Sequence, residues 1–119
     1  MRDPESMLPL TPLWFSILLS LADQSRHGYA IIKQIEARTS GAMSPAAGTV
    51  YLALQRLVEE GVIQAVPGEP SESKRPRKLY DLTPFGRAVA VAEAGRVRDQ
   101  ANWATESFAL PAHRDSKGS

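Results

Sequence analysis

Proline and glycine divide this sequence into segments whose helical ends can be predicted directly. A Ser or Thr stands immediately before a Pro at three points: Thr11-Pro12, Ser44-Pro45 and Thr83-Pro84. Such a hydroxyl caps the free N–H groups of a first helical turn, and proline suits the first helical position because no N–H is needed there. Gly41 and Gly61 suit the left-handed residue just beyond a helix. The chain is therefore predicted to form short helices separated by tight turns.

Apolar residues at helical spacing predict which helix faces are buried. The first helix, over residues 13–21, is apolar on most sides and is expected to be buried over most of its circumference. After a polar loop at 23–26, a second helix opens at His27, and its buried face is expected to hold Tyr29, Ile32 and Ile35. The third helix carries an apolar stripe of Val50, Leu54, Leu57 and Val58. The second and third helices with their short turn fit a helix-turn-helix.

Two short β-prone segments follow the helices. Residues 62–66 and 78–82 are predicted strands, with Tyr80 and Leu82 on one face. The intervening stretch 67–73 is rich in Pro, Gly and Ser and is expected to be an exposed loop. Three helices followed by a long-looped hairpin predict a mainly α fold, a winged helix-turn-helix with a two-stranded wing.

The last predicted helix is longer than the domain requires. It begins at Thr83-Pro84 and continues to about Ala109 before Pro111, a length of about 40 Å. Packing against the domain is expected of Phe85, Ala88, Val89 and Ala92. A second set follows heptad spacing and forms a predicted dimerisation seam of Ala90, Ala94, Val97, Ala101, Ala104 and Phe108. Since a projecting seam needs a partner, a homodimer is expected.

These elements divide the 119 residues into one compact domain with flanking segments. The expected division is an N-terminal arm at 1–9, a winged-helix domain at 10–83, a dimerisation helix at 84–110 and a disordered tail at 111–119.

The composition excludes several classes of protein and site. Cysteine is absent, which excludes disulfides, a thiolate nucleophile and cysteine-ligated metals. No P-loop, dinucleotide-binding or nucleophile-elbow motif is present, so neither an enzyme nor a cofactor is expected. The N-terminus is too polar and acidic for a signal peptide, and the apolar stretch 13–22 is too short to span a bilayer. A cytoplasmic protein without membrane association is therefore expected.

The net charge is nearly balanced, 14 Lys and Arg against 13 Asp and Glu, so an electrostatic argument has to be local. Four cations surround Pro76 in the predicted wing: Lys74, Arg75, Arg77 and Lys78. A cationic loop suits contact with DNA phosphates, although a solvated hairpin tip has the same composition. The third helix begins with small residues that allow close approach to DNA, and its candidate contacts are Ser44, Thr49, Tyr51, Gln55 and Arg56. A partly buried core position for Tyr51 is an equal alternative.

Three separated motifs resemble a known family. They are His27-Gly28-Tyr29-Ala30-Ile31; Gly48-Thr49-Val50-Tyr51 with Leu54, Arg56-Leu57 and Glu60-Gly61-Val62-Ile63; and Arg77-Lys78-Leu79-Tyr80-Asp81-Leu82-Thr83 with Gly86. In this order they closely resemble the PadR family of bacterial transcriptional regulators, over roughly Leu10 to Phe108. The resemblance implies a homodimeric winged-helix repressor that places the third helix in the major groove of double-stranded DNA. It also implies that Thr49 and Tyr51 lie near phosphates.

The single C-terminal helix resembles the short branch of this family, which includes multidrug sensors. Some of these members hold flat aromatic compounds between two tryptophans at the dimer centre. Here Val97 occupies that tryptophan position, and Trp103 lies nearly two turns later. A candidate cleft for a small aromatic effector would comprise Trp14, Phe15, Val97 and Trp103. Core packing of Trp14 and Phe15 is the alternative for the cleft, and a winged-helix module that binds a protein instead of DNA is the alternative for the function.

Overall fold

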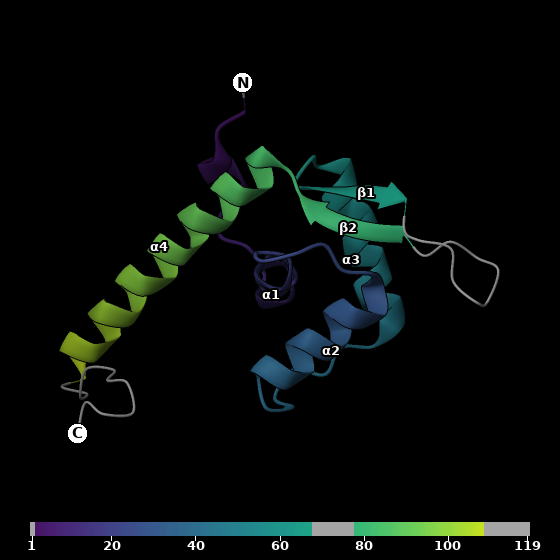
Figure 1. The fold of residues 1–119 in the computed structure, drawn as a ribbon. Coiled ribbons are helices and arrows are strands. Elements are labelled where there is room, and N and C mark those ends of the chain that lie inside the picture. The colour runs from purple at the N-terminus through teal and green to yellow at the C-terminus, as the bar shows by residue number, and fades with distance from the viewer. Residues whose placement is uncertain (1, 68–77, 109–119) are drawn as a thin grey trace.

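The computed structural model describes residues 2–67 and 78–108 of the chain, drawn in colour in Figure 1. Its elements are a 3-10 helix η1 (Pro4–Met7), helices α1 (Pro12–Ser20), α2 (Gly28–Arg38) and α3 (Ala47–Glu59), strands β1 (Ile63–Pro67) and β2 (Lys78–Leu82), and helix α4 (Pro84–Ser107). The strands pair antiparallel, with Ile63 opposite Leu82 and Pro67 opposite Lys78. The predicted mainly α, winged helix-turn-helix fold is confirmed.

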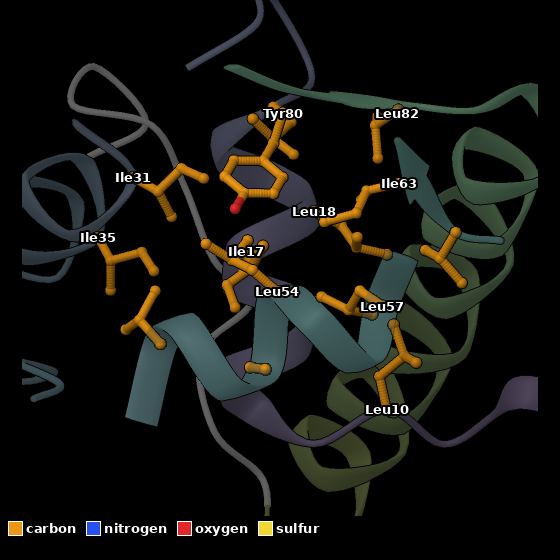
Figure 2. Packing of buried hydrophobic residues seen from close by; sticks show 14 of the residues in the cluster. Leu10, Ile17, Leu18, Ile31, Ile35, Leu54, Leu57, Ile63, Tyr80 and Leu82 are labelled. Atoms are coloured by element: carbon orange, nitrogen blue, oxygen red, sulfur yellow. The ribbon is translucent and has the colours of Figure 1, made fainter. Parts of the chain in front are cut away.

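Helix α1 lies at the centre of the molecule. Ile17 and Leu18 of α1 are fully buried, and Figure 2 shows them between side chains of α2, α3 and the sheet. Tyr80 and Leu82 both point into this core from β2, as their shared face predicts. Other buried members of the same cluster are Leu21, Ile31, Ile35, Val50, Leu54, Leu57, Val62, Ile63 and Val89. One continuous core therefore holds α2, α3 and the wing strands in fixed relation to each other.

Two of the three predicted N-caps are confirmed. The Thr11 hydroxyl accepts from the Trp14 N–H at the start of α1, and the Thr83 hydroxyl accepts from the Gly86 N–H at the start of α4. The cap at Ser44 is wrong: α3 begins at Ala47, and its N-cap residue, Ala46, makes no side-chain cap.

The predicted buried faces of α2 and α3 need correction at their edges. Tyr29 is exposed, and the buried residues of α2 are Gly28, Ile31, Ile32 and Ile35. Val58 is exposed on α3, whose buried face includes Ala53 instead. On α1, Leu19 is exposed, and Ala88 on α4 is exposed as well. Helical spacing predicted the middle of each buried face correctly, but it also included residues at the edge of the face that are exposed.

The expected polar loop at 23–26 takes part in the sheet. The Arg26 N–H donates to the Tyr80 carbonyl (3.2 Å), and the Tyr80 N–H donates to the Arg26 carbonyl (2.9 Å). The Arg26 side chain donates from Nε to the Ser20 carbonyl at the end of α1 (2.7 Å). This bridge ties the segment before α2 to the wing strand β2.

The N-terminal arm and Leu10, which follows it, are each bonded to a distant part of the chain. Arg2 donates to the Glu60 carbonyl (3.0 Å) and pairs with the Glu60 carboxylate just after α3. Glu93 of α4 is only 1% exposed, and its carboxylate accepts from the Leu10 N–H (3.1 Å). Arg96 donates to both Glu93 oxygens, from Nε (2.6 Å) and Nη2 (2.9 Å). The arm and Leu10 thereby link the end of α3 to the middle of α4.

The buried Glu93 makes the stability of the fold dependent on pH. Hydrogen bonds from Arg96, reinforced by the Leu10 N–H, hold the pKa of Glu93 below its usual range despite burial. A lowered folded-state pKa contributes stability that is complete above the unfolded-state pKa and is lost as the pH falls through the folded-state value. We expect Glu93→Gln to lower the free energy of unfolding by about 2 kcal/mol at neutral pH, since the two bonds from Arg96 and the one from the Leu10 N–H lose their charged acceptor.

The same difference should shrink in acid, where the wild-type carboxylate also takes up a proton. Urea unfolding of both proteins near pH 7 and near pH 3 measures this change. Glu106→Gln, at an exposed position on the same helix, is the matched control. A wild-type to Glu93→Gln difference that stays constant with pH would contradict the assignment.

In the described ranges, no helix is both long and apolar enough to cross a membrane.

Candidate nucleic-acid interface

The turn between α2 and α3 is closed by the side chain of Thr39, the residue directly after α2. The Thr39 hydroxyl donates to the Ile35 carbonyl (2.8 Å) and accepts from the Met43 N–H (3.0 Å). Ser40 and Gly41 both have positive φ, 51° and 81°, which reverses the chain direction within two residues. The helix-turn-helix is therefore built with a tight, internally bonded turn, and α3 follows it directly.

Ser44 belongs to a small polar network beside this turn. Its hydroxyl donates to Glu36 Oε2 (2.7 Å), and Lys33 Nζ lies 3.4 Å from Glu36 Oε1. The Ser44 hydrogen bond, aided by Lys33, lowers the pKa of Glu36, and the same carboxylate raises the pKa of Lys33. Ser44 would have to release Glu36 before its hydroxyl could donate to a phosphate. The structure thus gives Ser44 a bonding partner within the protein.

Helix α3 presents a continuous exposed face opposite its buried stripe. Its first turn, from Ala47 to Thr49, is exposed and uncapped by any side chain. Along the middle of the face lie Leu52, Gln55 and Glu59, all exposed. A helix with its N-terminal turn open and an exposed face of this length can enter a DNA major groove.

The candidate residues of α3 lie on both edges of that face. Thr49 and Arg56 line a shallow hollow of about 280 Å³ that also includes Trp14 of α1. Tyr51 lies on the opposite edge, towards the start of α2 and the wing strands, and Gln55 shares a second hollow with Lys78 there. The structure therefore separates Thr49 and Arg56 from Tyr51 across the width of the helix.

Tyr51 lies at the junction of three elements. It lines a hollow of about 590 Å³ with His27, Gly28 and Tyr29 from the start of α2, and with Lys78 and Tyr80 from β2. Tyr51 is 47% exposed although it borders all three elements. Burial, with a smaller contribution from the neighbouring Tyr51, raises the pKa of Tyr80. Tyr51 is not a member of the buried core cluster, and its contact with a phosphate stays a prediction.

The root of the wing supplies the described cation nearest to this junction. Lys78, the first residue of β2, is exposed and lines the hollows on both sides of Tyr51. The other three predicted wing cations, Lys74, Arg75 and Arg77, lie outside the described residues. The tail from residue 111 lies outside them as well.

Several exposed residues near this face were not singled out from the sequence. Leu52 lies at the middle of the α3 face, where an apolar side chain can contact a thymine methyl group. Tyr29 and Lys33 are exposed on α2, with Lys33 Nζ 5.3 Å from the Tyr29 ring centroid. Leu52 was detectable as the apolar residue outside the Val50, Leu54 and Leu57 stripe. Nothing in the sequence pattern distinguished Tyr29 from a buried residue.

The predicted dimerisation seam begins at Ala90, which packs against the core, and continues along the part of α4 that projects beyond it. Ala94, Val97, Ala101 and Phe108 are exposed in the single chain, and Ala90 and Ala104 are half-buried. In Figure 1 the second half of α4 extends away from the other elements. Trp103 is exposed on this half, whereas Trp14 and Phe15 are partly buried against the core. Within the single chain, two of the predicted effector residues, Trp14 and Phe15, therefore pack against the core, and the other two, Val97 and Trp103, are exposed on α4.

The parts of the chain that the structure describes contain no group of three His, Asp or Glu side chains able to hold a metal ion.

Comparison with known proteins gives one family and a consistent set of folds. A model described as the transcriptional regulator PadR-like family matches residues 17–92. An uncharacterised protein from Lysinibacillus sphaericus is 35% identical over 72 residues, which are 60% of this chain and 65% of that protein. The chain thus spans just under two thirds of this relative.

Solved structures extend the similarity to the fold. A transcriptional regulator from Clostridium thermocellum is 26% identical, with a TM-score of 0.69 over 79% of this chain and 87% of the other. A PadR family transcription regulator from Clostridium difficile is 24% identical, with a TM-score of 0.69 over 82% and 98%. Bacillus subtilis PadR in complex with operator DNA is 24% identical, with a TM-score of 0.63 over 69% and 47%. The last two, at this level of identity, are likenesses of fold.

Proposed function

Because the chain belongs to the PadR-like family of transcriptional regulators, we propose that it is a homodimeric repressor that binds a pseudo-palindromic DNA operator. This is a family of regulators and not of enzymes. The observation that carries the proposal is the open face of α3, which lies beside the exposed Lys78 at the root of the wing. The similar fold of a PadR protein in complex with operator DNA supports the same conclusion.

In this proposal, α3 enters the major groove with its N-terminal turn foremost. Gln55 and Arg56 are the side chains suited to reading base edges, and Leu52 adds an apolar contact. The hydroxyl groups of Thr49 and Tyr51 donate hydrogen bonds to phosphate oxygens on either side of the groove. The wing contacts the adjacent backbone through Lys74, Arg75, Arg77 and Lys78. Ser44 contributes by fixing the turn through Glu36, and directly only if that bond opens.

The second copy binds through the seam on α4. The six seam residues present small and apolar side chains at heptad spacing, which suits two helices that approach closely. A two-fold dimer would place its two α3 helices one or two DNA turns apart and would therefore prefer a pseudo-palindrome. The effector in this proposal is a small planar aromatic compound bound near Trp103 at the dimer interface. A compound that quenches tryptophan fluorescence and weakens operator binding would meet that role.

The experiment that tests the proposal is a gel shift with DNA from upstream of the chain's own coding sequence. A discrete complex that survives competitor DNA would support sequence-specific binding. A diffuse shift that disappears with salt would reduce the function to non-specific attachment. If no discrete complex forms there, selection from random sequences extends the search to distant operators, and failure of that selection would overturn the proposal.

The wing cations are expected to set the salt dependence of binding. Each neutralised phosphate contributes a slope of about −0.9 in the logarithmic plot of affinity against salt. We expect the triple variant Arg75→Ala, Arg77→Ala, Lys78→Ala to flatten the slope by roughly 2 to 3 between about 50 mM and about 200 mM salt. Fluorescence anisotropy with labelled operator measures both slopes. Arg98→Ala, which removes an exposed cation from α4, should leave the slope unchanged, and an equal slope for the triple variant would exclude the wing.

A protein-binding module is the second candidate function. It is favoured by the exposed carboxylate of Glu59 and the exposed Leu52 and Val58 on α3, which resemble a protein contact more than a phosphate contact. This candidate predicts that random-sequence selection fails even at low salt. A partner protein should then be retained by the wild type and lost with Leu52→Asp.

A further inference from the structure

The ring of Tyr51 lies directly on the backbone of Gly28, the first residue of α2. A Cβ built on Gly28 would lie 2.5 Å from Tyr51 Cε1, 2.6 Å from Cζ and 2.6 Å from the hydroxyl oxygen. Gly28 does not have the positive φ that Gly41 and Gly61 show. A larger residue at this position would therefore conflict with the space that the end of the Tyr51 ring occupies, and not with the conformation of the backbone.

The hollow around this contact has the chemistry of a phosphate site. Among the residues that the structure describes, its lining comprises His27, Gly28, the exposed Tyr29, Tyr51 and Lys78, and the buried Tyr80, and it includes no carboxylate. Hydroxyl donors and a lysine are the groups that bind DNA phosphate oxygens. The hydroxyl end of Tyr51, the part that lies nearest to Gly28, is thus placed at the edge of a hollow that the exposed Tyr29 and Lys78 also line.

We propose that Gly28 is a positioning residue for DNA binding, which holds the Tyr51 hydroxyl where it donates to a backbone phosphate. This inference rests on the proposed function and extends it to a residue that itself contacts no DNA. The methyl group of an alanine at position 28 would displace the end of the Tyr51 ring by about 1 Å, because the two groups would have to move apart to an ordinary contact distance. Because the ring is half exposed, it can move without disturbing the core. A hydrogen bond to phosphate does not tolerate a displacement of that size.

A double-mutant cycle separates positioning from a general structural effect. We expect Gly28→Ala and Tyr51→Phe each to weaken operator binding about tenfold, as the loss of a bond to a charged group implies. The double variant should be no weaker than Tyr51→Phe alone, because the hydroxyl that Gly28 positions is already absent. The salt slope should stay unchanged in all three variants, since no cation is removed. Gly95→Ala on α4, where the nearest atom is 4.0 Å from the new Cβ, is the matched control.

The outcomes distinguish this inference from the function on which it rests. Wild-type affinity in Gly28→Ala, or effects that multiply in the double variant, would overturn the positioning role and leave the regulator intact. Absence of any DNA binding by the wild type would overturn both. If Gly28→Ala unfolds, the same change in a Tyr51→Ala background removes the clash: folding and binding equal to Tyr51→Ala would support the proposal, and weaker binding would refute it.

Discussion

Replacing Gly86 by alanine is expected to destabilise the fold by at least about 3 kcal/mol, at the upper end of overpacking costs. A Cβ at this position would overlap the carbonyl oxygen of Val62 and lie 2.8 Å from its carbonyl carbon. The obstacle is backbone, and it is bonded: the Val62 carbonyl accepts from the Thr83 N–H (3.1 Å), and the Val62 N–H donates to the Leu57 carbonyl (3.0 Å). Relief of the clash would therefore move α4 away from the end of α3.

Gly95 supplies a matched control on the same helix. Its added Cβ meets no atom closer than 4.0 Å, so Gly95→Ala should gain up to about 1 kcal/mol of helix propensity. Urea unfolding followed by far-ultraviolet circular dichroism measures both variants against the wild type. Equal stabilities of Gly86→Ala and Gly95→Ala would show that α4 does not depend on this close approach.

The second large effect concerns assembly. We expect Val97→Glu to raise the dimer dissociation constant at least about 100-fold, because the two-fold seam would bring two unpaired carboxylates together. Val97 is the largest residue in the middle of the predicted seam and is 38% exposed in the single chain. Light scattering across a concentration series measures the dissociation directly.

Asn102→Glu is the corresponding control, because Asn102 is exposed on the same helix at a heptad position on the outer side of the seam. It should leave the dimer intact. Operator binding should fall with Val97→Glu and not with Asn102→Glu, since each monomer would engage only one half-site. A dimer that survives Val97→Glu would place the interface on another surface.

Features decided within a few residues were predictable from the sequence. The Thr11 and Thr83 caps bond to N–H groups three residues later, and Gly61 takes its positive φ of 76° immediately after α3. The Ser44 cap was wrong because α3 begins at Ala47, two residues later than the Ser44-Pro45 pair predicts, and the Ser44 hydroxyl donates instead to Glu36 of α2. A local motif permits a helix start, but contacts with another element can decide where the helix begins.

Burial decided by distant contacts could not be predicted. Glu93 resembles a surface residue of α4 in sequence, and its burial depends on the Leu10 N–H, 83 positions earlier. Arg26 lies in a polar stretch, yet it pairs with Tyr80 through two backbone bonds. In the candidate site, the residue types were predicted, but the contact between Tyr51 and Gly28 depends on how α2 and α3 pack. Spacing along one helix contains no information about that distance.

The Val62 carbonyl also has a consequence for the spacing of the two DNA half-sites that the proposed dimer would select. It lies where α3 ends, β1 begins and the first turn of α4 rests, with only Glu60 and Gly61 between α3 and Val62. The angle between α3 and α4 is thus fixed by a short connection. In the proposed dimer, the two α4 helices are paired, so the distance between the two α3 helices is fixed as well. One inserted base pair shifts a half-site by about 3.4 Å and about a tenth of a turn, a change such a rigid frame cannot follow. Spacing would then discriminate between operators as strictly as base sequence does.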